Sequence, residues 1–172
     1  MKRSVGLSLL AVSLVLVGAP SAQAQGMHRI GGGVEYLRTL GDIKDAPEFD
    51  ANALGFVASY QYVTNPFRIE GDLELIPDFG GTDEMLFAPQ AYLLVGGLIY
   101  GGVGIGAGYF DGDWLSDPFY ALRGGVDLPL GVFDLDAFAL YRFHDAAILK
   151  DLDESDLDSI TFGALIRFHI GD

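Results

Sequence analysis

The stretch Phe67–Ile76 reads FRIEGDLELI, and its side chains change character at every step. The odd positions are apolar or glycine, and the even positions carry the charges of Arg68, Glu70, Asp72 and Glu74. Because successive side chains of a strand point to opposite faces, this pattern predicts a β-strand with one apolar and one charged face. Such a strand belongs either to a soluble sandwich, whose charged face meets water, or to a membrane barrel, whose apolar face meets lipid.

The first 24 residues have the features of a secretory signal peptide. Lys2 and Arg3 form a basic start, an apolar run covers residues 5–17, and Ala22-Gln23-Ala24 is an A-x-A cleavage motif. The apolar run is short for a spanning helix, which needs about 20 residues. We therefore expect cleavage after Ala24 and one mature domain over residues 25–172. The alternative is an uncleaved membrane anchor.

The composition excludes several classes of function. The 172 residues include no cysteine, which rules out disulfides, thiol catalysis and cysteine-ligated metals. The net charge of −14 makes a nucleic-acid partner unexpected, because phosphate contacts need a basic surface. After the signal peptide there is no apolar run of spanning-helix length, so a membrane role would have to use strands.

Eight segments alternate in the way that Phe67–Ile76 does. They cover residues 28–37, 52–63, 67–76, 85–95, 98–110, 118–128, 134–144 and 159–170. The connections between them alternate too: tight turns lie at 64–66, 96–97 and 129–133, and longer acidic connections lie at 38–51, 77–84, 111–117 and 145–158. This rhythm is typical of outer-membrane barrels. It predicts an all-β fold, an eight-stranded antiparallel up-and-down transmembrane β-barrel.

Aromatic residues on the apolar faces cluster at two levels. One group falls near the long-connection ends of the strands: Tyr36, Phe56, Phe87, Tyr109, Tyr120, Phe143 and Phe162. A looser group falls near the tight turns: Tyr62, Phe67 and Phe168. Two aromatic girdles around an aliphatic band are what the two interfaces of a bilayer select. The apolar faces are therefore expected to meet lipid.

The opposite faces should then fill the interior of the barrel. Their charged residues are Arg29, Glu35, Arg68, Glu70, Asp72, Glu74, Arg123, Asp127, Arg142 and Arg167, and their bulky residues are Tyr92, Tyr100, Phe119 and Phe138. Unpaired charges would be costly there, so we predict a network of ion pairs and hydrogen bonds. Eight strands leave an interior that side chains can fill, so no wide channel is expected.

Two local features of the predicted sheet carry separate expectations. Pro89 lacks a backbone N–H, so a bulge or weak pairing is expected around it. Four glycines of segment 98–110 share the inward face: Gly102, Gly104, Gly106 and Gly108. They either make room for long Arg and Glu side chains opposite or allow sharp curvature.

With these features the chain resembles the small eight-stranded outer-membrane barrels of the OmpX and OmpA-barrel type, a generic outer-membrane protein β-barrel domain. The last strand, with apolar residues from Ile160 to Phe168 at every second position, resembles the insertion signal that such proteins present to the barrel assembly machinery. Family members commonly end on the aromatic residue, whereas here residues 169–172 follow Phe168. The resemblance implies a monomer in the outer membrane of a diderm bacterium, in contact with outer-membrane lipid and lipopolysaccharide.

Two segments of the sequence are candidates for chemistry. The segment around His144 faintly resembles the His-x-Ser-Asn stretch of outer-membrane lipid A deacylases, but the nucleophile position is Ala146, whose methyl group cannot attack an ester. The acidic run Asp151, Asp153, Glu154, Asp156 and Asp158 could gather a divalent cation, although it lacks the glycine of the EF-hand loop. His28, His144 and His169 are too dispersed to suggest a metal site. No catalytic, cofactor-binding or metal-binding residue is therefore assigned, and no cofactor is expected.

The predicted function is that of a non-enzymatic outer-membrane barrel with a structural or surface-interaction role and no wide pore. One alternative is a barrel with a narrow lumen that binds a small molecule or lipid. A second is a lipid A-modifying enzyme, which the missing nucleophile disfavours. A third is a soluble, lipocalin-like periplasmic barrel.

Overall fold

The computed structural model describes residues 26–40, 50–81, 84–115, 118–143 and 158–170. Its strands are β1 (Met27–Thr39), β2 (Asn52–Thr64), β3 (Phe67–Ile76), β4 (Leu86–Gly96), β5 (Ile99–Gly106), β6 (Tyr109–Phe110), β7 (Asp113–Trp114), β8 (Phe119–Pro129), β9 (Phe133–Phe143) and β10 (Ser159–Ile170). A single 3₁₀ turn, η2 (Phe79–Gly81), lies between β3 and β4. Within these ranges no helix is long and apolar enough to cross a membrane.

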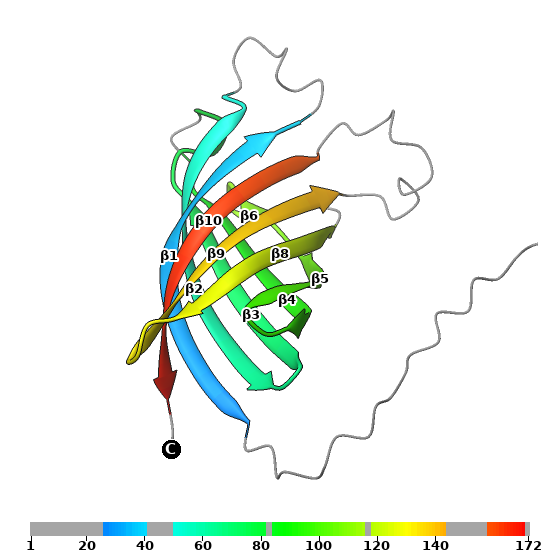
Figure 1. The fold of residues 1–172 in the computed structure, drawn as a ribbon. Helices are drawn as coiled ribbons and strands as arrows, with labels where there is room; N and C mark the ends of the chain where they lie inside the picture. Colours follow the sequence, from blue (N-terminus) through cyan, green and yellow to red (C-terminus); the bar gives the residue numbers. More distant parts are fainter. Residues whose placement is uncertain (1–25, 41–49, 82–83, 116–117, 144–157, 171–172) are drawn as a thin grey trace, which may run out of the picture.

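The strands close into a barrel (Figure 1). Every pairing between neighbours is antiparallel, β1 pairs with both β2 and β10, and β3 pairs with both β2 and β4. Strands β5 and β6 act as one barrel strand, because both pair with β4 in a single register: Gln90 lies opposite Gly106, and Phe87 lies opposite Tyr109. The predicted eight-stranded up-and-down barrel is confirmed.

The split between β5 and β6 lies beside Pro89. Pairing between β4 and its neighbour stops at Gly106 and resumes at Tyr109 without a change of register. The pairing of β4 with β3 runs through Pro89 without a break. Weak pairing is thus confirmed and a bulge is not found. Pro89 has no N–H to donate on the β5 side, where its carbonyl still accepts from Ala107 N–H at 3.1 Å, and the pairing with β3 stays intact.

The connection predicted at 111–117 is partly wrong. Residues Asp113–Trp114 form β7, which folds back on β6 and pairs Tyr109 with Trp114. Their rings meet edge to face, with centroids 5.3 Å apart. Asp111, with φ at 49°, and Gly112, with φ at 86°, supply the tight reversal between the two strands. This hairpin extends the barrel wall at the long-connection end.

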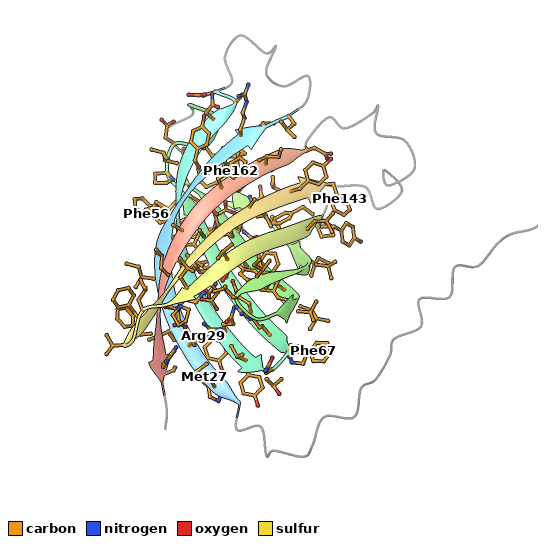
Figure 2. All side chains as sticks on the ribbon, viewed as in Figure 1. Met27, Arg29, Phe56, Phe67, Phe143 and Phe162 are labelled. Carbon is orange, nitrogen blue, oxygen red and sulfur yellow. The ribbon has the colours of Figure 1, made fainter. Side chains whose placement is uncertain are left out.

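The side chains alternate between outside and inside along every long strand, with charges inside. In β3 the Ile69 side chain is 57% exposed, whereas its neighbour Glu70 is 1% exposed. All ten charged residues predicted to face inward are buried, and so are the four predicted interior rings. This arrangement is the reverse of a soluble sandwich, in which charges face water. Figure 2 shows the outward apolar side chains around the barrel.

Most of the predicted aromatic positions face outward, at two levels. Phe56 and Phe162 lie toward the long-connection end and Phe67 toward the tight-turn end (Figure 2). Phe143 departs from the prediction, since it is only 6% exposed. Its ring packs against Tyr120 and Tyr141, with centroids about 6 Å from each. Phe143 is therefore a packing residue at the rim of the barrel.

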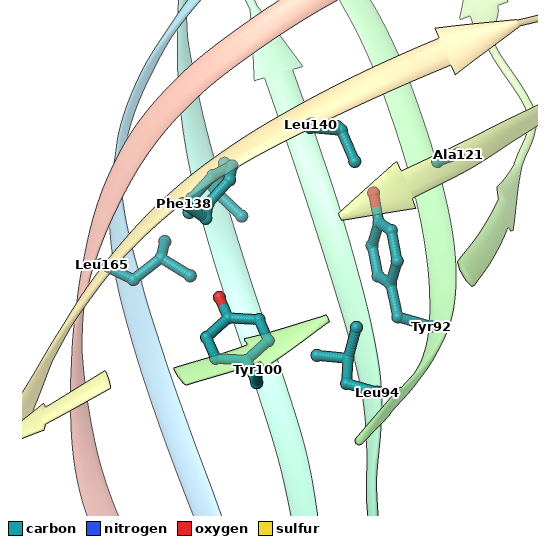
Figure 3. Packing of buried hydrophobic residues seen from close by; sticks show 8 residues of the cluster. Tyr92, Leu94, Tyr100, Ala121, Phe138, Leu140 and Leu165 are labelled. Atoms are coloured by element: carbon teal, nitrogen blue, oxygen red, sulfur yellow. The ribbon is translucent and has the colours of Figure 1, made fainter. Parts of the chain in front are cut away.

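Two apolar clusters lie among the interior charges. The larger one is shown in Figure 3 and comprises Val57, Tyr92, Leu94, Tyr100, Ala121, Phe138, Leu140 and Leu165. The second lies near the long-connection end and comprises Leu37, Ala53, Ile76 and Leu86, with Phe79 and Phe110 packed on it. The interior is therefore a filled core of both apolar and ionic layers.

Candidate functional site

The interior charges form the most extensive polar arrangement in the described part of the chain. At its centre, Glu70 Oε1 accepts hydrogen bonds from Arg123 Nη1 at 2.6 Å and from Arg167 Nη2 at 2.8 Å. Arg123 Nη1 also donates to Asp72 Oδ2 at 2.7 Å, and Arg167 Nη2 donates to Asp136 Oδ2 at 3.0 Å. These residues come from β3, β8, β9 and β10, so the central ion pairs connect opposite walls of the barrel.

A second group of charges lies at the tight-turn end. Asp127 Oδ2 accepts from Arg29 at 2.8 Å and from Arg68 at 2.6 Å. Arg29 also reaches Asp134 at 2.5 Å, and Asp134 lies 2.8 Å from the ring nitrogen Nε2 of His169. The Arg68 guanidinium donates in addition to the backbone carbonyl of Gly97. Side chains from β1, β3, β8, β9 and β10 thus occupy this mouth of the barrel.

A third group lies toward the long-connection end. Glu74 Oε2 is 2.8 Å from Arg142 Nη2 and accepts from Gln90 Nε2 at 2.7 Å. The Tyr92 hydroxyl donates to Gln90 Oε1. Glu35 is buried at the same level of the barrel. Together the three groups confirm the predicted network, and they occupy the interior along its length.

Four interior rings each cover a glycine of the neighbouring strand and contact an arginine. A Cβ placed on Gly104 would come within 2.3 Å of the Tyr92 ring, and the guanidinium carbon of Arg123 lies 5.2 Å from the centre of that ring. The same relation holds, in the order glycine, ring and arginine, for Gly106, Phe119 and Arg142, for Gly125, Tyr100 and Arg68, and for Gly163, Phe138 and Arg123. Each arginine is therefore held by carboxylates and by an aromatic face.

This arrangement corrects one expectation for the inward glycines. Gly104 and Gly106 do not make room for Arg or Glu side chains, because rings fill the space beside them. Each of the four ring–glycine pairs stands directly opposite in the strand register, for example Tyr92 and Gly104. A flat ring needs a neighbour without a side chain in order to lie against the wall. The arginines then pack on the ring.

We expect Gly104→Ala to lower the free energy of unfolding by about 1–3 kcal/mol, because the new methyl group displaces the Tyr92 ring from Arg123. Gly71→Ala is the matched control, since Gly71 lies in β3 and a Cβ there would meet nothing within 4 Å. That control should be neutral or slightly stabilising. Urea titration of both variants in lipid vesicles measures the difference. Equal effects at the two positions would contradict the ring–glycine packing.

The described residues offer little for catalysis. Ser59 accepts a hydrogen bond from Arg167 Nη1 at 2.6 Å and stands opposite Asp72 in the strand register, so its hydroxyl belongs to the central ion-pair group of the interior. His28 lies on the outer surface, 2.7 Å from the Tyr60 hydroxyl. In the part of the chain that is described, no group of three His, Asp or Glu residues is placed to hold a metal ion.

His144, Ala146 and the acidic run from Asp151 to Asp156 lie outside the described residues. Asp158, the last residue of that run, is described. It is buried and accepts a hydrogen bond from the Tyr141 hydroxyl. The acidic run as a cation site therefore stays a prediction.

Sequence reasoning missed one exposed charge and two pairing partners. The alternation of segment 134–144 puts Asp134 and Asp136 on the inward face together with Arg142, but it does not predict their central position in the ion-pair groups. Arg38 was assigned to a connection, whereas it lies in β1 with its side chain exposed. The sequence does contain a signal for the position of Arg38, because Arg38 continues the alternating outward row of Val34 and Tyr36.

Comparison with solved structures places this barrel among known folds. The neisserial surface protein A, NspA, superposes with a TM-score of 0.62 over 82% of this chain and 96% of that chain, at 14% identity. The fold is that of the small outer-membrane barrels. A second structure is Ail, the attachment invasion locus protein of Yersinia pestis, solved with the heparin analogue sucrose octasulfate. It matches at a TM-score of 0.50 and 18% identity, over 84% of this chain and 99% of Ail. No protein-family model and no curated protein matches the sequence.

Proposed function

We propose that this chain is an outer-membrane barrel of a diderm bacterium, exported with a signal peptide that is removed after Ala24. Its role is structural or surface-interactive, without catalysis and without a wide pore. The observation that carries the proposal is the inverted distribution of side chains: aliphatic and aromatic residues cover the outside, and ion pairs fill the inside. Such a molecule is matched to a bilayer, in which the outer face needs no water.

The charged interior supports the part of the proposal that concerns the pore. Arg123 and Arg167 bridge the walls through Glu70 and Asp136, and rings such as Phe138 take up space beside them. A solute of ordinary size would have to break several buried ion pairs to pass. The filled interior favours a scaffold for the long connections over a transport path.

The positions of the strand ends support a proposal for the orientation of the barrel in the membrane. Strand β1 begins and strand β10 ends at the tight-turn side (Figure 1), and His28 pairs with Ile170 there. In outer-membrane barrels the short turns face the periplasm and the long connections face the exterior. We propose the same orientation here, with the barrel as a monomer among outer-membrane lipid and lipopolysaccharide, inserted by the barrel assembly machinery, and without a nucleic-acid partner.

The test combines folding and conductance of the mature chain. We expect a detergent-folded protein whose gel mobility changes on boiling, and planar-bilayer recordings without large, stable, porin-sized conductance, because side chains fill the lumen. A mature chain that is folded and monomeric in plain buffer would refute the membrane assignment. A porin-sized conductance from correctly folded protein would refute the closed interior.

A further inference from the structure

The interior of the barrel holds more acidic than basic groups. The strands bury seven carboxyl groups, those of Glu35, Glu70, Asp72, Glu74, Asp127, Asp134 and Asp136, and five guanidinium groups, those of Arg29, Arg68, Arg123, Arg142 and Arg167. Six of the seven carboxyl groups form an ion pair with an arginine. Within the described ranges Glu35 forms none, although it is only 4% exposed. Because a buried carboxylate without a cation is very costly, such a group normally takes up a proton.

Glu35 faces another carboxyl group instead of a cation. From β1 its side chain leans over Gly55 of β2, where an added Cβ would lie 3.1 Å from Glu35 Oε1. Its carboxyl group comes within hydrogen-bond reach of Glu74 of β3. Arg142 of β9 approaches Glu74, with Nη2 2.8 Å from Glu74 Oε2. Two adjacent carboxyl groups that share one cation cannot both be ionised without strong repulsion.

The neighbouring polar groups add no second cation in the described part of the chain. Asp72 of β3 is a further carboxyl group near Glu35. Gln90 of β4 donates through Nε2 to Glu74 at 2.7 Å, and its Oε1 accepts from the Tyr92 hydroxyl. On the β10 side, Gly163 stands opposite Glu35. The pair is therefore surrounded by one arginine, one acid and uncharged groups.

An apolar layer covers the pair on the long-connection side. It lies one inward row beyond Glu35 and Glu74 and comprises Leu37, Ala53, Ile76 and Leu86. All four side chains are buried. A hydrated cation that crossed this layer would have to give up its water, which is costly. A proton is the occupant that fits the site.

We propose that Glu35 and Glu74 hold one proton between them at neutral pH. Neutral Glu35 donates its carboxyl O–H to Glu74, and ionised Glu74 is paired with Arg142, so the pair as a whole carries the single charge that one arginine balances. Free glutamate is ionised above about pH 4.3, so the folded barrel binds one proton more than the unfolded chain. Folding therefore becomes less favourable as the pH rises. The inference depends on the geometry of the interior and not on the surface role proposed above.

The direct test detects the proton by infrared spectroscopy of the mature barrel folded in vesicles at neutral pH. A protonated carboxyl group has a carbonyl stretch that ionised carboxylates lack, and exposed acids are ionised at this pH. We expect this band in wild type. Glu35→Gln and Glu74→Gln should each remove the contribution of one carboxyl group, because the carboxylate that remains is balanced by Arg142. Asp113→Asn is the control, since it removes an exposed carboxylate of β7 and should leave the band unchanged.

Urea unfolding in the same vesicles over a series of pH values gives a second measurement. Between about pH 6 and pH 9 the folding equilibrium constant of wild type should fall with rising pH by up to about tenfold more per pH unit than that of Glu35→Gln. The glutamine amide donates a hydrogen bond to Glu74 at every pH, so this variant has no proton to lose. Asp113→Asn should keep the pH dependence of wild type.

The outcomes decide the proposal separately from the proposed function. A folded wild type without the band would show that a cation balances Glu35, and the shared proton would be wrong. A band that persists in both glutamine variants, or equal pH dependence in wild type and Glu35→Gln, would overturn it as well. If a variant does not fold, the presence or absence of the band in wild type decides. A wild type that folds only in plain buffer would instead refute the membrane assignment.

Discussion

Replacing Arg123 by methionine should lower the free energy of unfolding by about 3–5 kcal/mol. The Arg123 guanidinium contacts Glu70 and Asp72 at 2.6 and 2.7 Å and Asp136 at 3.4 Å, and it packs on the Phe138 ring at 4.1 Å. Methionine keeps much of the volume, but it leaves Asp72 buried without its cation and leaves Glu70 and Asp136 to share Arg167 alone. Urea unfolding in lipid vesicles, followed by the fluorescence of the single tryptophan, measures the loss.

The matched control is Arg38→Met, measured in the same lipid vesicles. The same charge is removed there from an exposed position without a described ion pair, so the change should stay within about 0.5 kcal/mol. A small effect at both positions would mean that water enters the interior and screens the carboxylates that Arg123 leaves. The closed interior on which the proposed function depends would then be wrong.

The faces of the strands could be predicted because alternation is a local property. Residues such as Glu70 and Ile69 differ in chemistry at adjacent positions, and the pleat of a strand sends them to opposite sides whatever the rest of the chain does. The choice of lipid for the apolar side needed more than one strand. That choice depended on the lengths of the connections and on the heights of rings such as Phe56 and Phe162 along their strands. Both features become visible only when all the strands are compared.

The pairing partners could not be predicted in the same way. Glu70 meets Arg123 across 53 residues and Arg167 across 97 residues of sequence. Which inward side chains share a level depends on the stagger of all the strands around the barrel, and alternation within one strand does not contain that stagger. The ring–glycine pairs could not be predicted for the same reason, since Tyr92 and Gly104 become neighbours only through the register of β4 and β5.

The ends of strands were the third source of error. Arg38 and Phe143 both lie at the long-connection end, where the alternating pattern runs into a connection and the sequence gives no clear stop. Propensity and pattern leave such boundaries uncertain by a few residues. Arg38 was therefore expected in a connection, although it is an exposed charge of β1. Phe143 was expected to face lipid, although its ring packs at the rim of the barrel.

Val103→Arg should lower the free energy of unfolding in vesicles by about 2–4 kcal/mol, the cost of a cation on the lipid face near the bilayer midplane. Val103 lies in the middle of β5, is 55% exposed, and stands between Leu93 and Leu122 of the neighbouring strands. Val132→Arg is the control. Val132 lies in the tight turn between β8 and β9, at the interface, where the cost should be about 0–1 kcal/mol.

The comparison is informative because Val132 is the more exposed of the two, at 79%. In water, exposure alone would make both substitutions cheap, since surface changes away from special contacts stay within about 0.5 kcal/mol. In a bilayer the free-energy cost of an arginine increases with its depth in the membrane. The substitution at Val103, the less exposed valine, should therefore cost several-fold more than the substitution at Val132. Small and equal costs at Val103 and Val132 would show that the apolar band meets water. The assignment of the apolar faces to lipid would then be wrong.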